Sequence, residues 1–171
     1  FGGQITEQKK IWNLSKQYGF KIIEDASHSL GASQNKIPVG NCKWSDITIF
    51  SFHPVKIITT AEGGVATTNS KKLYHKMKIL HLHGVSNSTY PLNRGFYSSF
   101  SQEFLGYNYR MNDIQAALGL SQLAQLDKFV KKRNDLSQSY KSLFKNTNIK
   151  PIDILKGNIS SCHLFVIRPK N

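Results

Sequence analysis

Two short polar clusters contain the residues of this sequence whose types could do chemistry. The first is Asp25-Ala26-Ser27-His28, and the second runs from Ser51 to Lys56 with the sequence SFHPVK. An aspartate can pair with a positive charge, a histidine can donate or accept a hydrogen bond, and a neutral lysine is a nucleophile. Taken singly, such an aspartate is often a helix cap and such a lysine is often only solvated. The clusters therefore matter only if the fold brings them together.

Each polar cluster follows a segment that we predict to be a buried strand. Residues 20–23 (FKII) form a short apolar run before Glu24-Asp25, and residues 47–50 (ITIF) lead into Ser51. Residues 63–68 (GGVATT) are a weaker strand candidate because of their glycines. Ligands of open α/β sheets bind beyond the carboxyl ends of the strands. We therefore expect the two clusters to meet at one edge of a sheet.

Helical patterns alternate with these strands. Asn112, with Gln115 three residues later, has the pattern of a capping box at the start of the longest helical region, in which we expect a bend near Asp127. Residues 85–107 lack a period and are predicted to be a long loop. The alternation favours an α/β layer fold with a largely parallel sheet. The apolar residues at helical spacing are Ile11, Leu14 and Tyr18 before Gly19; Leu73, Met77 and Leu80 between Ser70 and Gly84; and Ile114, Ala117 and Leu118, then Leu136, Tyr140 and Leu143.

Length and composition indicate a globular chain of one domain. It has 171 residues, of which 39% are hydrophobic and 19% charged. No apolar run approaches the ~20 residues that span a bilayer. Its two cysteines, Cys42 and Cys162, have no metal-like or redox-like spacing, which suits a reducing compartment. The chain begins at Phe1 and stops just after an apolar run, so we expect a fragment of a longer protein.

The net charge of +13 raises the question of nucleic-acid binding. The basic residues are spread along the chain, and the densest group is predicted to lie on a helix without interleaved aromatic residues, which favours a solvated surface. That group is Lys128, Lys131, Lys132 and Arg133. A metal site is also disfavoured, because His75 and His81 fall off one helix face and no cysteine or carboxylate cluster accompanies them.

Three segments of the chain resemble the DegT/StrS family of sugar aminotransferases, which have the type I fold of pyridoxal-phosphate enzymes. They are residues 24–31 (EDASHSLG), 50–64 (FSFHPVKIITTAEGG) and 105–123 (LGYNYRMNDIQAALGLSQL), with weaker agreement at His163-Leu164-Phe165. The resemblance implies a three-layer α/β large domain, with a mostly parallel sheet and flanking helices, truncated at both ends.

The resemblance also implies a division of the chain. Residues 1–145 would be part of the cofactor-binding large domain with its following long helix. Residues 146–171 would begin a small C-terminal domain.

The resemblance assigns roles to five residues. Lys56 is implied to bind the aldehyde of pyridoxal 5'-phosphate covalently, for which its amine must be neutral. Asp25 is implied to pair with the pyridine nitrogen and keep it protonated. Ser51 would bind the cofactor phosphate, and His28, where many members carry Gln, would hydrogen-bond the ring hydroxyl. Asn108 would reach the phosphate from the partner subunit, which implies a homodimer with shared active sites.

Small residues near these positions have two interpretations each. Gly63 and Gly64 could let the backbone pass close to the cofactor or could form a β-bulge. Ala116, Ala117 and Gly119 could admit a partner subunit or could seat their own helix against the sheet.

The resemblance is strongest to the branch that aminates C4 of a UDP-linked 4-keto-6-deoxy-N-acetyl sugar on the route to pseudaminic acid. It implies glutamate as amino donor and a cytoplasmic enzyme without nucleic-acid or membrane partners. Branches acting on a UDP-4-keto-pentose or a dTDP-4-keto-hexose are alternatives. Related dehydratases carry His in place of the lysine, which disfavours them here because Lys56 is present. A non-catalytic basic fragment is the alternative from another class.

Overall fold

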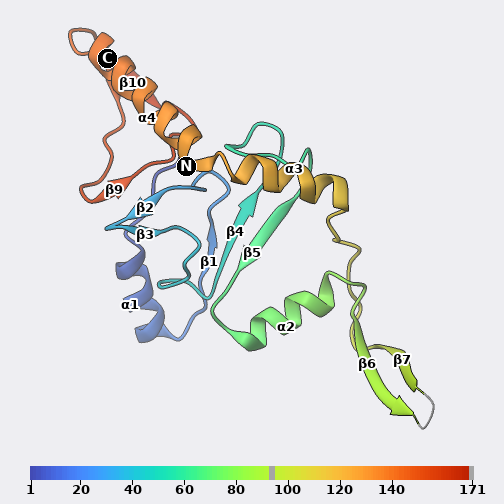
Figure 1. The fold of residues 1–171 in the computed structure, drawn as a ribbon. Helices are drawn as coiled ribbons and strands as arrows, with labels where there is room; N and C mark the ends of the chain where they lie inside the picture. Colours follow the sequence, from blue (N-terminus) through green and yellow to red (C-terminus); the bar gives the residue numbers. More distant parts are fainter. Residues whose placement is uncertain (93–94, 170–171) are drawn as a thin grey trace. The chain divides into compact units, whose positions relative to one another are not determined.

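The computed structural model describes residues 1–92 and 95–169, and within residues 87–100 it describes the backbone alone. The described chain forms two compact units. One combines residues 1–69 with residues 113–171, and the other consists of residues 70–112. The first unit contains both polar clusters (Figure 1).

A three-stranded sheet with the order β1-β4-β5 lies at the centre of the first unit. β1 (Ile23–Asp25) and β4 (Ile47–Ser51) are parallel, and β5 (Gly64–Thr67) runs antiparallel to β4. β1 begins at the last residue of the predicted strand 20–23. The reason is local, since the Ile22 N–H donates to the Asp46 carboxylate at 2.9 Å and not to a neighbouring strand. The parallel pair nevertheless ends at the two predicted clusters.

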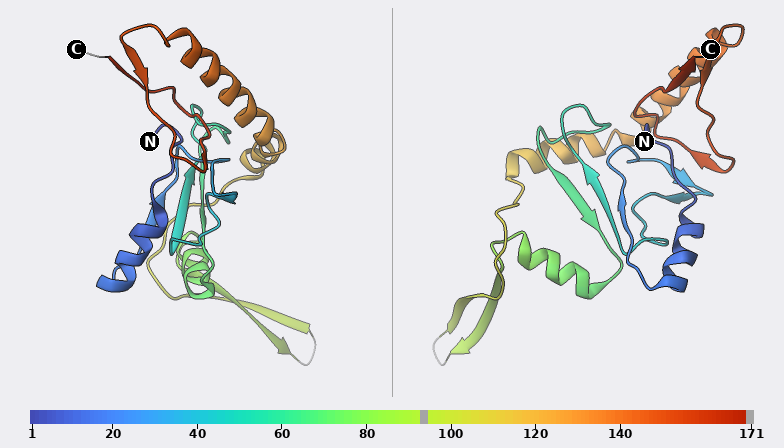
Figure 2. Two further views of the ribbon diagram at one scale, coloured as in Figure 1. Left: turned by 90° about the vertical axis from the view of Figure 1, so that its left-hand side faces the viewer. Right: turned by 180° about the vertical axis from the view of Figure 1, so that it is seen from behind.

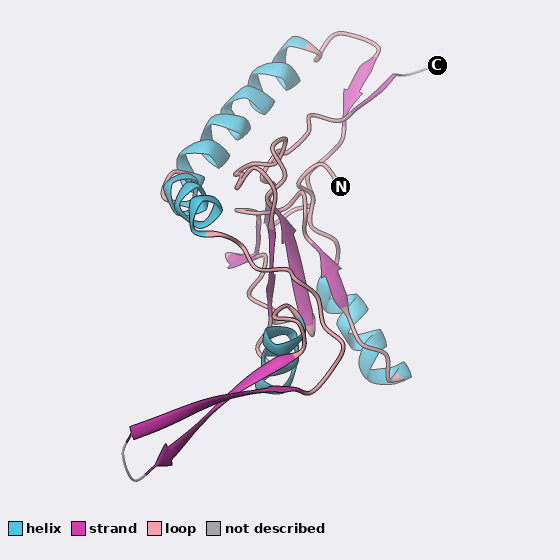
Figure 3. Cartoon of the chain, turned by 90° about the vertical axis from the view of Figure 1, so that its right-hand side faces the viewer, coloured by secondary structure: helices cyan, strands magenta, loops and turns pink. Residues whose placement is uncertain are grey.

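Helices lie on the two sides of this sheet (Figures 2 and 3). α1 (Gln8–Tyr18) lies on one face and the pair α3 (Asp113–Leu123) and α4 (Leu126–Leu143) lies on the other. α1 ends as predicted, with Gly19 at φ 76° donating its N–H to the Ser15 carbonyl. The predicted bend near Asp127 is a break between two helices. This layering is the three-layer α/β arrangement that the sequence favours.

The core of the first unit joins the segment after β4 to α4. Ile57 and Ile58 are 6% and 2% exposed, and they pack with Val130. Leu126 and Phe129 of α4 complete this contact. Full burial of an isoleucine side chain stabilises a protein by about 1.5–3 kcal/mol. These two isoleucines therefore anchor the loop that carries Lys56, their neighbour in sequence.

Two small antiparallel sheets complete the first unit. β2 (Ser33–Gln34) pairs with both β3 (Ile37–Pro38) and β9 (Asn158–Ile159). β8 (Ile149–Pro151) pairs with β10 (Ile167–Pro169). Through β9, the C-terminal part of the chain reaches the segment that follows the first polar cluster.

The second unit corrects one prediction. α2 (Lys71–Leu80) forms as expected, and the Ser70 hydroxyl accepts the Leu73 N–H. The predicted loop 85–107, however, contains a hairpin of β6 (Val85–Leu92) and β7 (Gly95–Gln102). The prediction failed because the hairpin is built from serines and aromatic residues without apolar alternation. Residues 93–94, also within that predicted loop, lie outside the described residues.

The predicted apolar faces of α3 and α4 are largely exposed in this chain. Ile114 is 83% exposed and Leu143 is 72% exposed, whereas the buried positions of α4 are Val130 and Ser137. Helical periodicity identifies an apolar face, but it does not say what covers that face. Among residues 1–92 and 95–169, no helix combines the length and apolar character needed to cross a membrane.

Candidate active site

Asp25 lies at the carboxyl end of β1 as an exposed, ionised carboxylate. One of its oxygens accepts hydrogen bonds from the Ser27 hydroxyl at 2.6 Å and from the Ser27 backbone N–H at 3.0 Å. These two bonds lower the pKa of Asp25. Burial opposes them, and the nearby His28 and Lys56 add smaller lowering effects. Asp25 is therefore available as an anion that can pair with a cation.

Lys56 lies in the turn that follows β4, and its backbone N–H donates to the His53 carbonyl at 2.9 Å. The side chain is half-buried, between the exposed Val55 and the buried Ile57. Its charge contributes to lowering the pKa of both Asp25 and His28. Lys56 thus follows β4, and Asp25 and His28 lie at and after the end of the parallel neighbour β1, close enough for the lysine charge to act on both. Their shared role in a site stays a prediction.

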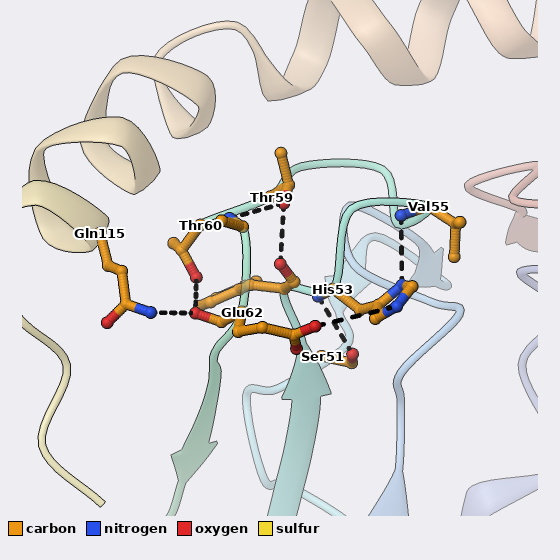
Figure 4. Close-up of polar contacts among 9 residues, drawn as sticks. Ser51, His53, Val55, Thr59, Thr60, Glu62 and Gln115 are labelled. Atoms are coloured by element: carbon orange, nitrogen blue, oxygen red, sulfur yellow. Dashed lines mark hydrogen bonds and ion pairs between the residues drawn. The ribbon is translucent and has the colours of Figure 1, made fainter.

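Hydrogen bonds hold the loop between β4 and β5 (Figure 4). The Phe52 carbonyl accepts the Thr59 hydroxyl at 2.9 Å and the Thr60 N–H at 3.0 Å. The Glu62 carbonyl accepts the Thr60 hydroxyl at 2.8 Å and the Gln115 side-chain amide at 2.9 Å. The loop is therefore fixed at both of its ends and tied to α3, which restricts where Lys56 can lie.

Ser51 and His53 begin this loop. The Ser51 hydroxyl oxygen accepts the His53 N–H at 3.4 Å, so its proton can be directed at an anion. His53 accepts the Val55 N–H through Nδ1 at 3.3 Å, and its Nε2 lies 4.0 Å from a Glu62 carboxylate oxygen (Figure 4). Ser51 is thus placed at the end of β4, close in sequence to the lysine turn.

His28 is held from the N-terminal side and from the C-terminal side. Its Nδ1 accepts the Gly2 N–H at 3.2 Å, and its ring centroid lies 4.3 Å from that of His163. Burial lowers the pKa of His28, and the charge of Lys56 lowers it further. The neutral form of His28 is therefore favoured at this place.

His163 was not among the predicted site residues, although it belongs to the segment of weaker family agreement, His163-Leu164-Phe165. The side chain is 9% exposed and touches His28. Burial lowers the pKa of His163 to about 4, and the electrostatic effects of the nearby His28, Lys56 and Arg133 act in the same direction. Sequence spacing could not reveal this contact, because it joins segments from opposite ends of the chain.

The small residues near the site are explained by packing within the chain. A Cβ on Gly64 would lie 2.7 Å from the Phe50 carbonyl oxygen, and one on Gly119 would lie 2.8 Å from the Thr60 methyl group. Gly64 therefore allows β5 to pair closely with β4. Gly119 seats α3 against the loop that follows β4, which favours the second interpretation for that residue.

Asn108 belongs to the second unit. Its backbone pairs with Leu82 in an isolated bridge, and its side-chain oxygen accepts the Arg110 Nε–H at 3.2 Å. Its assignment to a cofactor phosphate stays a prediction. Within the described part of the chain, no three His, Cys, Asp or Glu side chains gather as a metal site would require.

The whole chain, residues 1–171, matches the model of the DegT/DnrJ/EryC1/StrS aminotransferase family. Among curated relatives, the UDP-4-amino-4,6-dideoxy-N-acetyl-beta-L-altrosamine transaminase of Campylobacter jejuni strain 81-176 is 42% identical over 168 residues, which are 98% of this chain and 42% of the relative. The Helicobacter pylori protein of the same description is 35% identical over 168 residues. The chain thus spans less than half the length of these relatives.

Solved structures agree in fold. Helicobacter pylori PseC, described as an aminotransferase of pseudaminic acid biosynthesis, superposes with a TM-score of 0.88 at 33% identity, over 99% of this chain and 43% of that one. The PLP-form of the sugar aminotransferase Spr1654 from Streptococcus pneumoniae has a TM-score of 0.84 at 28% identity, over 99% and 46%. These matches confirm the predicted fold class. The chain belongs to the DegT/DnrJ/EryC1/StrS aminotransferase family.

Proposed function

We propose that the complete protein is a pyridoxal-phosphate-dependent aminotransferase that transfers an amino group from glutamate to C4 of a UDP-linked 4-keto-6-deoxy-N-acetyl sugar. The observation that carries this proposal is the meeting of Asp25, His28 and Lys56 at the ends of β1 and β4. The sugar is proposed from the descriptions of relatives that are 35–42% identical to this chain.

The residues present fit pyridoxal phosphate. When bound, this cofactor supplies an aldehyde that joins to amines and a protonated ring that withdraws electrons from the substrate. Asp25, ionised and exposed, suits the ring nitrogen, and neutral His28 suits the ring hydroxyl. Ser51 provides a hydroxyl for the phosphate, and a single hydroxyl is only part of what an anion needs. Asn108 of a second subunit is proposed as a further phosphate ligand.

Lys56 has two proposed tasks. It holds the cofactor covalently before the substrate arrives, and its freed amine then moves a proton at the reacting carbon of the substrate. Both tasks require the amine to stay at one position. The buried Ile57 and Ile58 and the threonine hydrogen bonds of the loop support this requirement.

The same proposal includes the assembly, the compartment and the domain division of the enzyme. It is a homodimer with shared active sites and acts in the cytoplasm, in line with the free thiols of Cys42 and Cys162. Residues 1–145 are part of the large domain and residues 146–171 begin the small one. The +13 charge serves no nucleic acid, so binding to DNA or RNA should be weak and should vanish near physiological salt.

The test is amino transfer by the complete protein with pyridoxal phosphate and glutamate. Three keto sugars are offered separately: the UDP-linked 4-keto-6-deoxy-N-acetyl sugar, a UDP-4-keto-pentose and a dTDP-4-keto-hexose. Mass spectrometry should find the amino sugar mainly from the first, and Lys56→Ala should abolish it while the exposed Lys21→Ala retains it. A preference for either other sugar would refute the proposed sugar substrate. No transfer with any of the three would refute the proposed activity and favour the non-catalytic alternative.

A further inference from the structure

We propose that the segment Ser160–Leu164 presses His163 against His28 and thereby fixes His28 as a neutral donor that carries its proton on Nε2. This makes His163 a positioning residue of the site. The inference rests on the proposed function for its purpose, which is to hold a hydrogen-bond donor at the cofactor's ring hydroxyl. The structural part, a buried imidazole pair with one fixed tautomer, stands on contacts within this chain.

The segment Ser160–Leu164 is joined to the residues around His28. The Ser161 hydroxyl donates to the His28 carbonyl at 2.8 Å, and the Leu164 N–H donates to the Gly2 carbonyl at 3.3 Å. A Cβ on Gly3 would lie 2.8 Å from both the Cys162 nitrogen and the Ser161 hydroxyl oxygen. The fit leaves no room for a side chain, so this segment and the chain's first residues pack backbone to backbone.

α4 holds the same segment from its other side. Arg133 donates to the carbonyls of Cys162 and His163 at 3.2 and 3.3 Å. Asn134 donates to the Ser160 carbonyl at 2.9 Å. The position of His163 is therefore set by its backbone and does not depend on what its own ring contacts.

The ring of His163 is enclosed and uncharged. It is 9% exposed, and its Nδ1 is buried without a hydrogen-bond partner among the residues that the structure describes. Burial lowers the pKa of His163 to about 4, with the charges of His28, Lys56 and Arg133 contributing. Its ring meets that of His28 at an angle of 52° and a centroid distance of 4.3 Å, so it shields one side of His28 from water.

The Gly2 N–H selects the tautomer of His28. It donates to Nδ1 at 3.2 Å, so a proton on Nδ1 would face another proton, and the neutral ring carries its proton on Nε2. Burial lowers the pKa of His28, and the charge of Lys56 lowers it further, against an opposing effect of Asp25. A neutral ring with a fixed N–H is a permanent donor, as an amide side chain is.

This explains how histidine can stand at a position where many family members carry Gln. A Gln amide donates at every pH, whereas an exposed histidine changes its charge near pH 6.5. A charged imidazole in place of a neutral one would also change the electrostatics of the site. Enclosure by His163 removes this sensitivity and lets His28 act as a constant donor.

The test is an NMR titration of the complete protein with isotope-labelled histidine, without cofactor. In the unchanged protein, His28 should be neutral with its proton on Nε2 and should titrate below the ordinary range. His163→Ala should raise the pKa of His28, because water reaches the ring, while the Gly2 N–H still selects the proton on Nε2. His163→Phe keeps an apolar ring in place and should preserve both properties. His81→Gln, in the second unit, is the control. It removes the NMR signal of His81 and should leave the pKa and the tautomer of His28 unchanged.

A folded His163→Ala protein with an unchanged pKa of His28 would overturn the proposal. If that variant does not fold, the unchanged protein still tests the proposal. A proton on Nδ1 of His28, or a pKa of His28 in the ordinary range, would overturn it. The outcome is independent of the proposed function, since no cofactor or turnover is involved. A protein that passes this test but transfers no amino group would refute the proposed function alone.

Discussion

Asp25 is kept ionised mainly by Ser27, two residues further along the chain. The hydroxyl and the backbone N–H of Ser27 both donate to one carboxylate oxygen, and the pKa of Asp25 falls below its usual value as a result. The proposed cation partner, a protonated ring nitrogen, needs this charge to be present at neutral pH. The proposed pairing with the ring nitrogen therefore requires the negative charge of Asp25 in addition to its position.

Asp25→Asn tests this requirement, because an amide cannot hold the pyridinium charge. A charge-assisted hydrogen bond contributes about 1.5–3 kcal/mol, so turnover should fall by about 10-fold to 100-fold or more while cofactor remains bound. Steady-state rates and the cofactor absorbance measure the two effects. Asp46→Asn is the matched control, since Asp46 binds Lys21 and the Ile22 N–H away from the site. Near-normal turnover of Asp25→Asn would mean that another residue faces the ring nitrogen.

His163 should make the folded protein sensitive to mild acid. Its folded pKa of about 4 lies below its ordinary 6.5, so between these values the unfolded chain binds a proton that the folded one does not. The free energy of unfolding should therefore fall as the pH drops from 6.5 to 4, by about 3 kcal/mol. Denaturant unfolding of the unchanged protein and of His163→Phe should diverge over this window. Parallel curves would show that His163 ionises normally in the folded state.

At the scale of elements, Gly3 determines how the first residues meet the segment Ser160–Leu164. Its φ is +96°, and a Cβ would lie within 2.9 Å of three atoms of that segment. Gly3→Ala thus combines backbone strain with a clash. Gly19 offers a matched control, because its φ is +76° and nothing lies within 4 Å of a Cβ there.

Gly19→Ala should cost about 1 kcal/mol from strain alone, and Gly3→Ala should cost about 1–3 kcal/mol more from overpacking. Urea unfolding of the two variants measures the difference. Gly3→Ala should also release His163 and raise the pKa of His28, which the histidine titration would report. Equal stability of the two variants would show that the segment adapts and does not fix His163.

The elements that carry Asp25 and Lys56 could be predicted from the sequence, because each follows a short apolar run. Parallel strands end at one edge of a sheet, so the clusters had to meet. The hairpin β6–β7 could not be predicted, since its polar strands have no apolar alternation and each depends on the other. The contact of His163 with His28 could not be predicted for a similar reason. Its place depends on hydrogen bonds to α4 and Gly2, which no spacing along the chain encodes.

At the scale of the whole molecule, α3 presents apolar side chains that this chain leaves uncovered. Ile114 is 83% exposed and Leu120 is 69% exposed, on a helix that is apolar on most of its surface. Helices of that kind are usually buried. The rest of the complete protein or a second subunit could cover them. A symmetric homodimer is the commonest assembly, and the proposed role of Asn108 requires one.

Complementation tests the shared site. Complete Lys56→Ala and Asn108→Ala proteins, each weak or inactive alone, are mixed under conditions that let subunits exchange. If Asn108 serves the partner's cofactor, a mixed dimer has one site with both changes and one with neither, so activity should partly return. Asn108→Ala mixed with unchanged protein controls for exchange. No recovery despite proven exchange would place Asn108 in the site of its own subunit.

Lys56 is proposed to bind pyridoxal phosphate covalently, and borohydride reduction, which makes this bond permanent, is the decisive measurement. The complete protein is loaded with cofactor, reduced and digested, and its peptides are mapped by mass spectrometry. The cofactor mass should be found on Lys56, and no labelled peptide should appear from Lys56→Ala under the same treatment. A label on any other lysine, or amino transfer that persists in Lys56→Ala, would contradict it.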